Sequence, residues 1–119
     1  MSWDIEASDE FAAWWRTLSG TQKEAVDATI GLLEERGPSL GRPHADTLSK
    51  MSKYPNMKEL RIQCGGDAYR VICAFDPRGV CILLLGGRKA DRKWYKAAVP
   101  RADSIYEKYL AELRAEGVL

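Results

Sequence analysis

The chain has 119 residues, of which 45% are hydrophobic and 29% are charged, and its net charge is +1. This length supports a hydrophobic core without disulfides or bound metal, so we expect a single domain over residues 1–119. The longest apolar run, residues 80–85, is far too short to span a membrane. The amino terminus lacks the layout of a signal peptide, and a cytoplasmic protein is the simplest interpretation.

The charge is distributed unevenly along the chain. Residues 1–36 carry a net charge of −5, residues 37–101 carry +8 and residues 102–119 carry −2. Positive potential is therefore concentrated in the middle of the chain. This pattern favours a polyanion or an acidic partner bound at one face, although solvated surface lysines alone would also produce it.

A short strand and two helices are predicted before residue 38. Residues 3–6 alternate between apolar and acidic side chains, as a strand does. Ser8 is a favourable N-cap for the first helix, and Thr21 with Glu24 has the spacing of a capping box at the start of the second. Apolar side chains follow each cap at helical spacing: Phe11, Trp14, Trp15 and Leu18 in the first helix, and Val26, Ile30 and Leu33 in the second.

Residues 38–56 form a long connection rich in Pro, Gly, Ser and Lys. A connection of this length in a small domain is usually functional or mobile. It holds the only histidine, His44, which is either a general acid or base or a solvent-facing loop residue. Lys53 lies near its end, and we expect it to reach over the strand that follows.

Residues 57–89 predict three antiparallel strands joined by two hairpins, with tight turns at residues 65–66 and 76–79. A two-residue turn at Gly65-Gly66 places Arg61 directly opposite Arg70. Like charges in this arrangement destabilise a sheet, and an anionic ligand would relieve the repulsion. The alternative is that both arginines are solvated or paired with Glu59.

Three cysteines, Cys64, Cys73 and Cys81, form no CxxC pair and leave an odd one. Their spacing predicts neither a zinc site nor a disulfide framework. Cys73 and Cys81 lie in predicted strands, where free cysteine behaves as a small apolar residue. A nucleophilic role for Cys64 is the least supported hypothesis, because no histidine accompanies it at an interpretable spacing.

Basic and aromatic side chains are interleaved over residues 88–96. Segments that contact RNA have this composition, because bases stack on rings and phosphates meet cations. The segment can equally be the start of an amphipathic helix with Trp94 in the core, and both interpretations can hold together. We expect Pro100 to start or kink the final helix, whose apolar stripe comprises Ala102, Ile105, Tyr106, Tyr109 and Leu113.

This order of elements, and short segments along nearly the whole chain, resemble the HigB-like, phage-derived branch of the RelE toxin superfamily. The segments include Leu40-Gly41-Arg42-Pro43 with Asp46, Lys58-Glu59-Leu60-Arg61, Tyr69-Arg70-Val71, Ala74-Phe75-Asp76-Pro77, Leu84-Leu85-Gly86-Gly87, Trp94-Tyr95, and Pro100 with Ala102-Asp103. The resemblance implies an α+β fold, with a small antiparallel sheet packed against an N-terminal helix hairpin and a C-terminal helix.

The resemblance also implies a function. Members of this family are toxins of type II toxin–antitoxin pairs, which enter the ribosomal A site and cut messenger RNA until a helix-turn-helix, HigA-like antitoxin neutralises them. A ribose 2′-hydroxyl attacks the adjacent phosphate, which requires a proton acceptor, stabilisation of the phosphate anion and a proton donor. No metal and no cofactor are expected.

Carried over by position, Arg61 and Arg70 resemble the phosphate-stabilising residues on the open face of the sheet. Lys89 and Tyr95 match the region that often supplies acid–base residues, and a lowered pKa there would come from neighbouring cations. The further RNA-binding candidates are Lys53, Lys58, Arg88, Arg92 and Lys93, although strict alternation places Lys58 off the arginine face. No histidine follows the last strand, unlike in some HigB-like toxins, so the identity of the acid and the base stays open.

A different class of function is compatible with the same residues. A non-catalytic RNA-binding or regulatory protein of this fold, acting through a protein partner, would use the basic segment without cutting RNA. The two hypotheses differ in one respect: an enzyme depends on single residues, whereas phosphate contacts in a binding protein contribute roughly equally.

Overall fold

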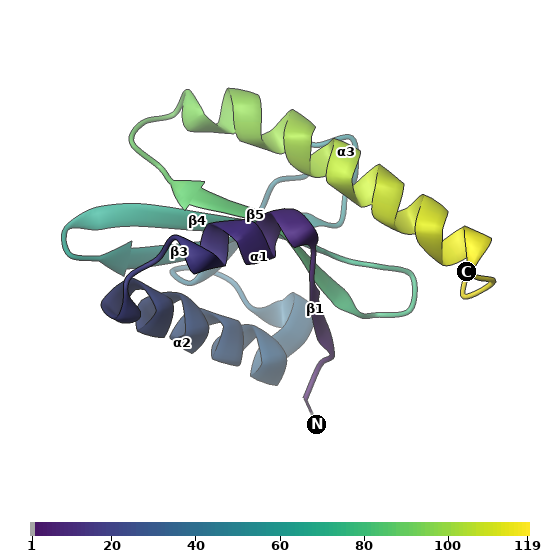
Figure 1. Ribbon diagram of the computed structural model, residues 1–119, viewed down its shortest axis with the longest axis horizontal. Coiled ribbons are helices and arrows are strands. Elements are labelled where there is room, and N and C mark those ends of the chain that lie inside the picture. Colours follow the sequence, from purple (N-terminus) through teal and green to yellow (C-terminus); the bar gives the residue numbers. More distant parts are fainter. Residues whose placement is uncertain (1) are drawn as a thin grey trace.

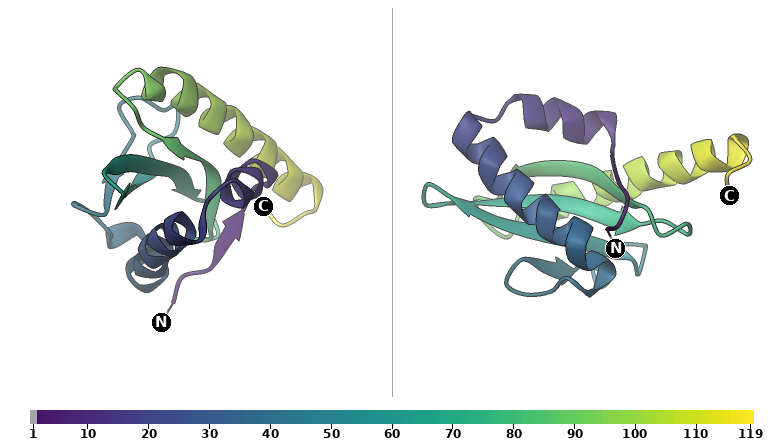
Figure 2. Two further views of the ribbon diagram at one scale, coloured as in Figure 1. Left: turned by 60° about the vertical axis from the view of Figure 1, so that its left-hand side comes forward. Right: turned by 90° about the horizontal axis from the view of Figure 1, so that it is seen from below.

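The computed structural model describes residues 2–119 and consists of a five-stranded sheet with helices on both faces (Figures 1 and 2). The strand order is β1-β5-β4-β3-β2, with β1 parallel to β5 and all other pairs antiparallel. The elements are β1 (Ile5–Ala7), α1 (Asp9–Arg16), α2 (Gly20–Arg36), a 3-10 turn (Gly37–Ser39), β2 (Ala45–Thr47), β3 (Met57–Cys64), β4 (Asp67–Phe75), β5 (Cys81–Arg88) and α3 (Trp94–Ala115).

The two N-terminal helices begin at serine caps. Ser8 caps α1 as predicted, since its Oγ accepts from the Phe11 amide at 3.0 Å. The capping box of α2 was predicted at the wrong pair: Ser19 and Gln22 form it. Because α2 starts at Gly20, Thr21 already lies inside the first turn, whereas Ser19 keeps the extended backbone that an N-cap needs.

The register of the β3–β4 hairpin is the predicted one. Arg61 pairs with Arg70 across the sheet, and the turn residues Gly65 and Gly66 both have positive φ. A two-residue turn with positive φ at both positions matches the twist of the strands and therefore fixes which residues face each other. The flanking pair Leu60 and Val71 points to the opposite face, where both side chains are fully buried.

The connection over residues 38–56 contains a strand that the sequence analysis missed. Strand β2 pairs with the free edge of β3 and sets Asp46 opposite Glu59. Three residues are too few to show an alternating pattern, so only the pairing with β3 reveals the strand. The end of the connection is anchored to α3, because the buried Asp103 carboxylate accepts hydrogen bonds from Ser52 Oγ and the Lys53 amide.

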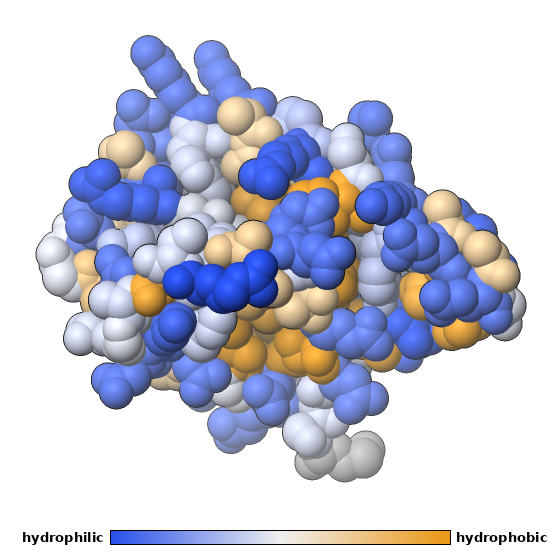
Figure 3. Space-filling view, viewed as in Figure 1, coloured by the Kyte–Doolittle hydropathy of each residue, from blue (hydrophilic) through white to orange (hydrophobic). Residues whose placement is uncertain are grey.

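Two apolar cores lie on the two faces of the sheet. Helices α1 and α2 cover one face, and α3 covers the other, as the two views of Figure 2 show. Since both faces are covered, β4 and β5 are apolar along nearly their whole length. In Figure 3 the apolar side chains visible near the middle of the molecule are surrounded by hydrophilic ones.

Helix α3 begins at Trp94, which packs partly buried against the core, so the interpretation of residues 88–96 as leading into an amphipathic helix holds. Pro100, predicted to start or kink the helix, does not start it but lies inside it. An internal proline loses a backbone hydrogen bond and costs about 3 kcal/mol. Burial of Ala98 and Val99 against the sheet offsets this cost and carries the helix through the proline. No helix within residues 2–119 has both the length and the apolar character needed to cross a bilayer.

Two glycines of β5 allow the helices to approach the sheet. A Cβ at Gly86 would overlap the ring of Trp14 from α1, and one at Gly87 would lie 2.8 Å from Trp94 Nε1 of α3. Adjacent residues of a strand point to opposite faces, so the two glycines serve the two helix layers separately.

We predict that Gly86→Ala lowers the free energy of unfolding by about 1–3 kcal/mol, because the added methyl group overpacks the contact with Trp14. Gly31→Ala is the matched control: it lies in α2 with no atom within 4 Å of the added Cβ. It should stabilise the protein by roughly 0.5–1 kcal/mol. Urea unfolding of both variants and of the intact protein checks the prediction. A Gly86→Ala variant as stable as the intact protein would contradict it.

Candidate functional site

A groove of about 690 Å³ runs between the start of α3 and the edge formed by β2 and β3. Five of its lining residues are basic and two are acidic, so its potential is positive. We call it the basic groove. It is lined by Arg42, Asp46, Thr47, Met51, Glu59, Arg61, Lys89, Arg92, Tyr95, Lys96, Val99 and Pro100.

The floor of the basic groove is organised by the carboxylate of Glu59, which is only 4% exposed. Its Oε2 lies 3.1 Å from Arg61 Nη1, and its Oε1 lies 3.2 Å from Arg70 Nε. The hydroxyl of Tyr95, contributed by α3, donates to Oε1 at 2.6 Å. One buried anion therefore holds two cations and a phenol in fixed positions.

The two facing arginines share one counter-ion. Glu59 pairs with both Arg61 and Arg70, as the alternative interpretation held, so the repulsion is relieved within the protein. Arg70 is not on an open face as expected. It is 3% exposed and its Nε also donates to the Tyr95 hydroxyl at 3.2 Å. Arg61, whose side chain is 23% exposed, is the arginine accessible to a ligand.

The pKa of Tyr95 shifts in the opposite direction from the one expected. Burial and the hydrogen bond to Glu59 raise the pKa of the Tyr95 hydroxyl, and the hydrogen bond from Arg70 opposes them only in part. Cations near in sequence were expected to lower this pKa, but the nearest charge in space is a carboxylate. Tyr95 is therefore a protonated phenol at neutral pH, able to donate a proton rather than to accept one.

The structure brings some of the other predicted residues to the groove. Lys89 places its Nζ 5.8 Å from the centroid of the Tyr95 ring, and Arg92 lines the same wall. Lys93 is exposed just before the first turn of α3, and its amide donates to Asp91 Oδ1 at 2.8 Å.

Lys93 does not line the groove, and three further predicted RNA-binding residues lie away from it. Lys58 projects to the opposite face, where its Nζ donates to the carbonyls of Pro38 and Leu40 at 2.8 and 2.7 Å. Lys53 pairs with Glu107 at 3.6 Å, and Arg88 pairs with Asp67 at 3.0 Å. None of these three lines the basic groove.

Four charged residues of the groove were not among the predicted site residues: Arg42, Asp46, Glu59 and Lys96. Glu59 and Arg61 are two apart on one strand and so share a face, a pattern that could have identified Glu59 as part of the site. Arg42 and Asp46 depend on β2, which was not predicted. His44 is half-buried beside them, does not line the groove, and contributes its carbonyl to a hydrogen bond from the Arg61 amide.

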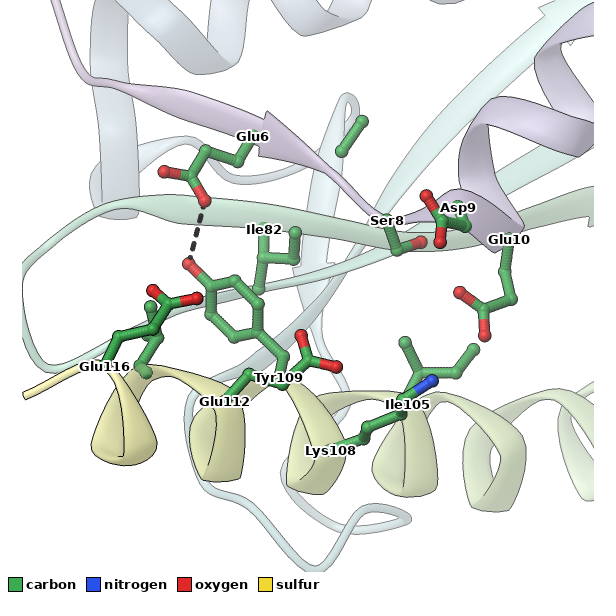
Figure 4. A pocket seen from close by; sticks show the side chains of 12 residues that line it. Glu6, Ser8, Asp9, Glu10, Ile82, Ile105, Lys108, Tyr109, Glu112 and Glu116 are labelled. Atoms are coloured by element: carbon green, nitrogen blue, oxygen red, sulfur yellow. Dashed lines mark hydrogen bonds between the residues drawn. The ribbon is translucent and has the colours of Figure 1, made fainter. Parts of the chain in front are cut away.

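A second hollow, of about 290 Å³, lies at the other end of α3 and has the opposite charge (Figure 4). We call it the acidic hollow. Five carboxylates and one lysine line it: Glu6, Asp9, Glu10, Glu112, Glu116 and Lys108. The Tyr109 hydroxyl lies within it, 3.1 Å from Glu6 Oε2 and 2.8 Å from Asp76 Oδ2. Its negative potential disfavours a polyanion, whereas the potential of the basic groove favours one. Within residues 2–119, no three His, Cys, Asp or Glu side chains lie together where they could hold a metal ion.

The sequence matches the family described as "Phage derived protein Gp49-like (DUF891)" over residues 13–107. The chain belongs to this Gp49-like family. The match covers both the β3–β4 hairpin and the start of α3, so all residues that line the basic groove lie within the matched range. The resemblance to phage-derived proteins is thereby confirmed.

Two proteins of Mycobacterium tuberculosis are similar to this Gp49-like chain. "Putative toxin HigB3" is 42% identical over 106 residues, which is 87% of this chain and 90% of that protein. "Putative toxin HigB2" is 39% identical over 107 residues, again 87% of this chain but 53% of that protein. The resemblance to HigB-like proteins is confirmed by these matches.

Solved structures with the same fold include RelE proteins. A mutant of the Escherichia coli toxin RelE in the free state superposes with a TM-score of 0.63 at 19% identity, covering 85% of this chain and 98% of that one. RelE in the intact Escherichia coli RelBE toxin–antitoxin complex gives 0.55 at 18% identity, covering 76% and 100%. The Gp49-like chain therefore has the predicted α+β, RelE-like fold.

We predict that Glu59→Ala destabilises the protein by about 3–5 kcal/mol, because it leaves the buried Arg70 guanidinium without its counter-charge. Arg61→Ala should cost about 1 kcal/mol or less, since Arg61 is partly solvated and its loss leaves Glu59 paired with Arg70. Thermal or urea unfolding distinguishes the two variants. Equal losses of stability would show that Glu59 does not organise the site.

Proposed function

We propose that this protein is the toxin of a type II toxin–antitoxin pair and that its basic groove cleaves messenger RNA on the ribosome. The observation that carries the proposal is the buried Glu59 carboxylate, which holds an accessible arginine and a protonated tyrosine together in a positively charged groove. Cleavage of RNA by its own 2′-hydroxyl needs a base, a cation and an acid within reach of one phosphate. The likeness to proteins named as HigB toxins supports the same function.

In the proposed reaction, Arg61 binds the phosphate at the bond to be cut. Its guanidinium turns from Glu59 Oε2 toward the phosphate oxygens, a movement that its partial exposure permits. Oε2 is then free to accept the proton of the attacking 2′-hydroxyl, so Glu59 is the general base. Arg70 stays bound to Oε1 and keeps the carboxylate in place.

The leaving group needs a proton, and Tyr95 is the proposed donor. The new bond joins the 2′-oxygen to phosphorus and the bond between phosphorus and the 5′-oxygen breaks. The Tyr95 hydroxyl turns from Glu59 Oε1 to the 5′-oxygen and gives it its proton, and Glu59, which holds the proton of the 2′-hydroxyl, then returns one to Tyr95. The raised pKa of Tyr95 keeps the proton available at neutral pH, and Glu59 and Arg70 orient the hydroxyl. Lys89 beside the ring supplies a cation that stabilises the phenolate as it forms.

The proposed partners follow from the same assignment. The substrate is messenger RNA in the ribosomal A site, and the neutralising partner is a helix-turn-helix, HigA-like antitoxin. The RelE structures with this fold include complexes with RelB antitoxins, which supports a protein partner for this chain. Both proposed partners are cytoplasmic, so the proposed location of the protein is the cytoplasm. The reaction as proposed uses no metal and no cofactor.

One observation favours the alternative, a non-catalytic RNA-binding or regulatory protein. Both Glu59 oxygens are already paired, and Arg70 is buried, so the groove could bind RNA through its outer cations alone. Such a protein would not depend on a single hydroxyl group, because its affinity would be spread over several phosphate contacts.

We predict that Tyr95→Phe lowers the rate of messenger RNA cleavage by about 10²- to 10⁴-fold, because it removes the proposed proton donor. The matched control is Tyr109→Phe, which removes a hydroxyl from the same helix at the acidic hollow. Expression of each protein in a bacterial host, with mapping of new messenger RNA 5′ ends, gives the readout. Growth arrest should follow induction of the intact protein and of Tyr109→Phe only.

Circular dichroism of each purified variant keeps the comparison valid by showing that it is folded. Tyr95→Phe is preferable to a substitution of Arg70, because truncation of that buried arginine would remove one of the two ion-pair partners of the buried Glu59. Cleavage by folded Tyr95→Phe at the rate of the intact protein would rule out the proposed acid. Unimpaired growth with the well-expressed intact protein would rule out the toxin.

A further inference from the structure

A smaller hollow of about 280 Å³ adjoins the basic groove on the other side of Arg61. It is lined by Arg42, Pro43, Arg61, Gln63 and Arg70, and none of these is a carboxylate. We call it the arginine hollow. Arg42 and Arg61 line both this hollow and the basic groove, so the two cavities meet at these side chains.

Arg42 is held in place by Asp46. Its Nε and Nη2 lie 2.9 and 2.8 Å from the same oxygen, Asp46 Oδ2. The other oxygen, Oδ1, accepts from the Thr47 amide at 2.8 Å, which fixes the carboxylate to the backbone of β2. Hydrogen bonds from Arg42 and Thr47 lower the pKa of Asp46, so the carboxylate is charged at neutral pH.

The pair stabilises the fold little. The side chains of Arg42 and Asp46 are 64% and 35% exposed, and an ion pair this solvated is worth about 1 kcal/mol or less. Its geometry nevertheless orients a planar guanidinium whose Nη1 has no partner within residues 2–119. Arginine offers donors on several edges, so one edge can bind Asp46 while another binds an anion.

The sheet register places this pair next to the proposed reaction centre. Asp46 and Glu59 face each other across β2 and β3, and each is neutralised by arginine. A single-stranded RNA carries one negative charge per nucleotide, so a phosphate bound at Arg61 has a neighbour one nucleotide away. The arginine hollow is the adjoining cavity that can receive this neighbour.

We propose that Arg42, oriented by Asp46, binds the RNA phosphate next to the one that is cut, so that the strand passes over Arg61 into the arginine hollow. Arg42 is then a substrate-positioning residue and Asp46 orients it. The inference rests on the proposed ribonuclease function and adds to it the path of the RNA backbone. Because Arg42 contacts a phosphate that does not react, it acts on binding of substrate and transition state alike.

The test uses programmed ribosomes carrying messenger RNA in which the phosphate on the 5′ or the 3′ side of the cleaved bond is a neutral methylphosphonate. With the intact protein, one of these two changes should raise KM about tenfold and leave kcat nearly unchanged. Arg42→Gln should show the same increase on unmodified RNA and no further increase on that modified RNA. The KM of Asp46→Asn for unmodified RNA should lie between those of the intact protein and of Arg42→Gln, because Arg42 keeps its charge but loses the carboxylate that orients it.

Lys108→Gln is the control, because Lys108 lines the acidic hollow. The KM of this variant for unmodified and for modified RNA should equal that of the intact protein. Urea unfolding midpoints of all variants should coincide. An equal methylphosphonate effect in the intact protein and in Arg42→Gln would overturn the inference while leaving the ribonuclease in place. Failure of the intact protein to cut unmodified RNA would overturn the proposed function, and the inference with it.

Discussion

The site depends on one buried carboxylate. The hairpin turn of the sheet forces Arg61 and Arg70 to face each other, and the buried guanidinium of Arg70 beside a second cation needs a counter-charge. Glu59 supplies that charge, and its Oε1 also accepts a hydrogen bond from the hydroxyl of Tyr95 on α3. The same interaction therefore stabilises the sheet, docks the start of the last helix and assembles the groups that the proposed chemistry needs.

The rest of the fold positions this network. Helices cover both faces of the sheet, but β5 has two glycines just before its last residue, and they let Trp14 and Trp94 approach its backbone. The contact with Trp94 sets the start of α3, and Tyr95 follows it directly. Charge then separates the two ends of α3: its first turns line the basic groove and its last turns line the acidic hollow.

Features set by neighbouring residues could be predicted from the sequence, whereas features set by tertiary contacts could not. Gly65-Gly66 determined the facing arginines, because a two-residue turn fixes the register. Strand β2 was invisible, since its three residues are stabilised by pairing with β3 rather than by their own pattern. The pKa of Tyr95 was expected to fall because of cations nearby in sequence, but burial and a carboxylate 36 positions away raise it. Arg42 was not predicted as a site residue, because its position beside the groove depends on the pairing of β2 with β3.

The chemistry of the RNA ends tests the central claim most directly. If Glu59 activates a 2′-hydroxyl and Tyr95 protonates the leaving oxygen, the upstream fragment carries a 2′,3′-cyclic phosphate and the downstream fragment a 5′-hydroxyl. Mass spectrometry of fragments released from programmed ribosomes by the purified protein identifies both ends. Fragments with a 3′-hydroxyl and a 5′-phosphate would contradict the account, because water rather than the ribose would then be the nucleophile.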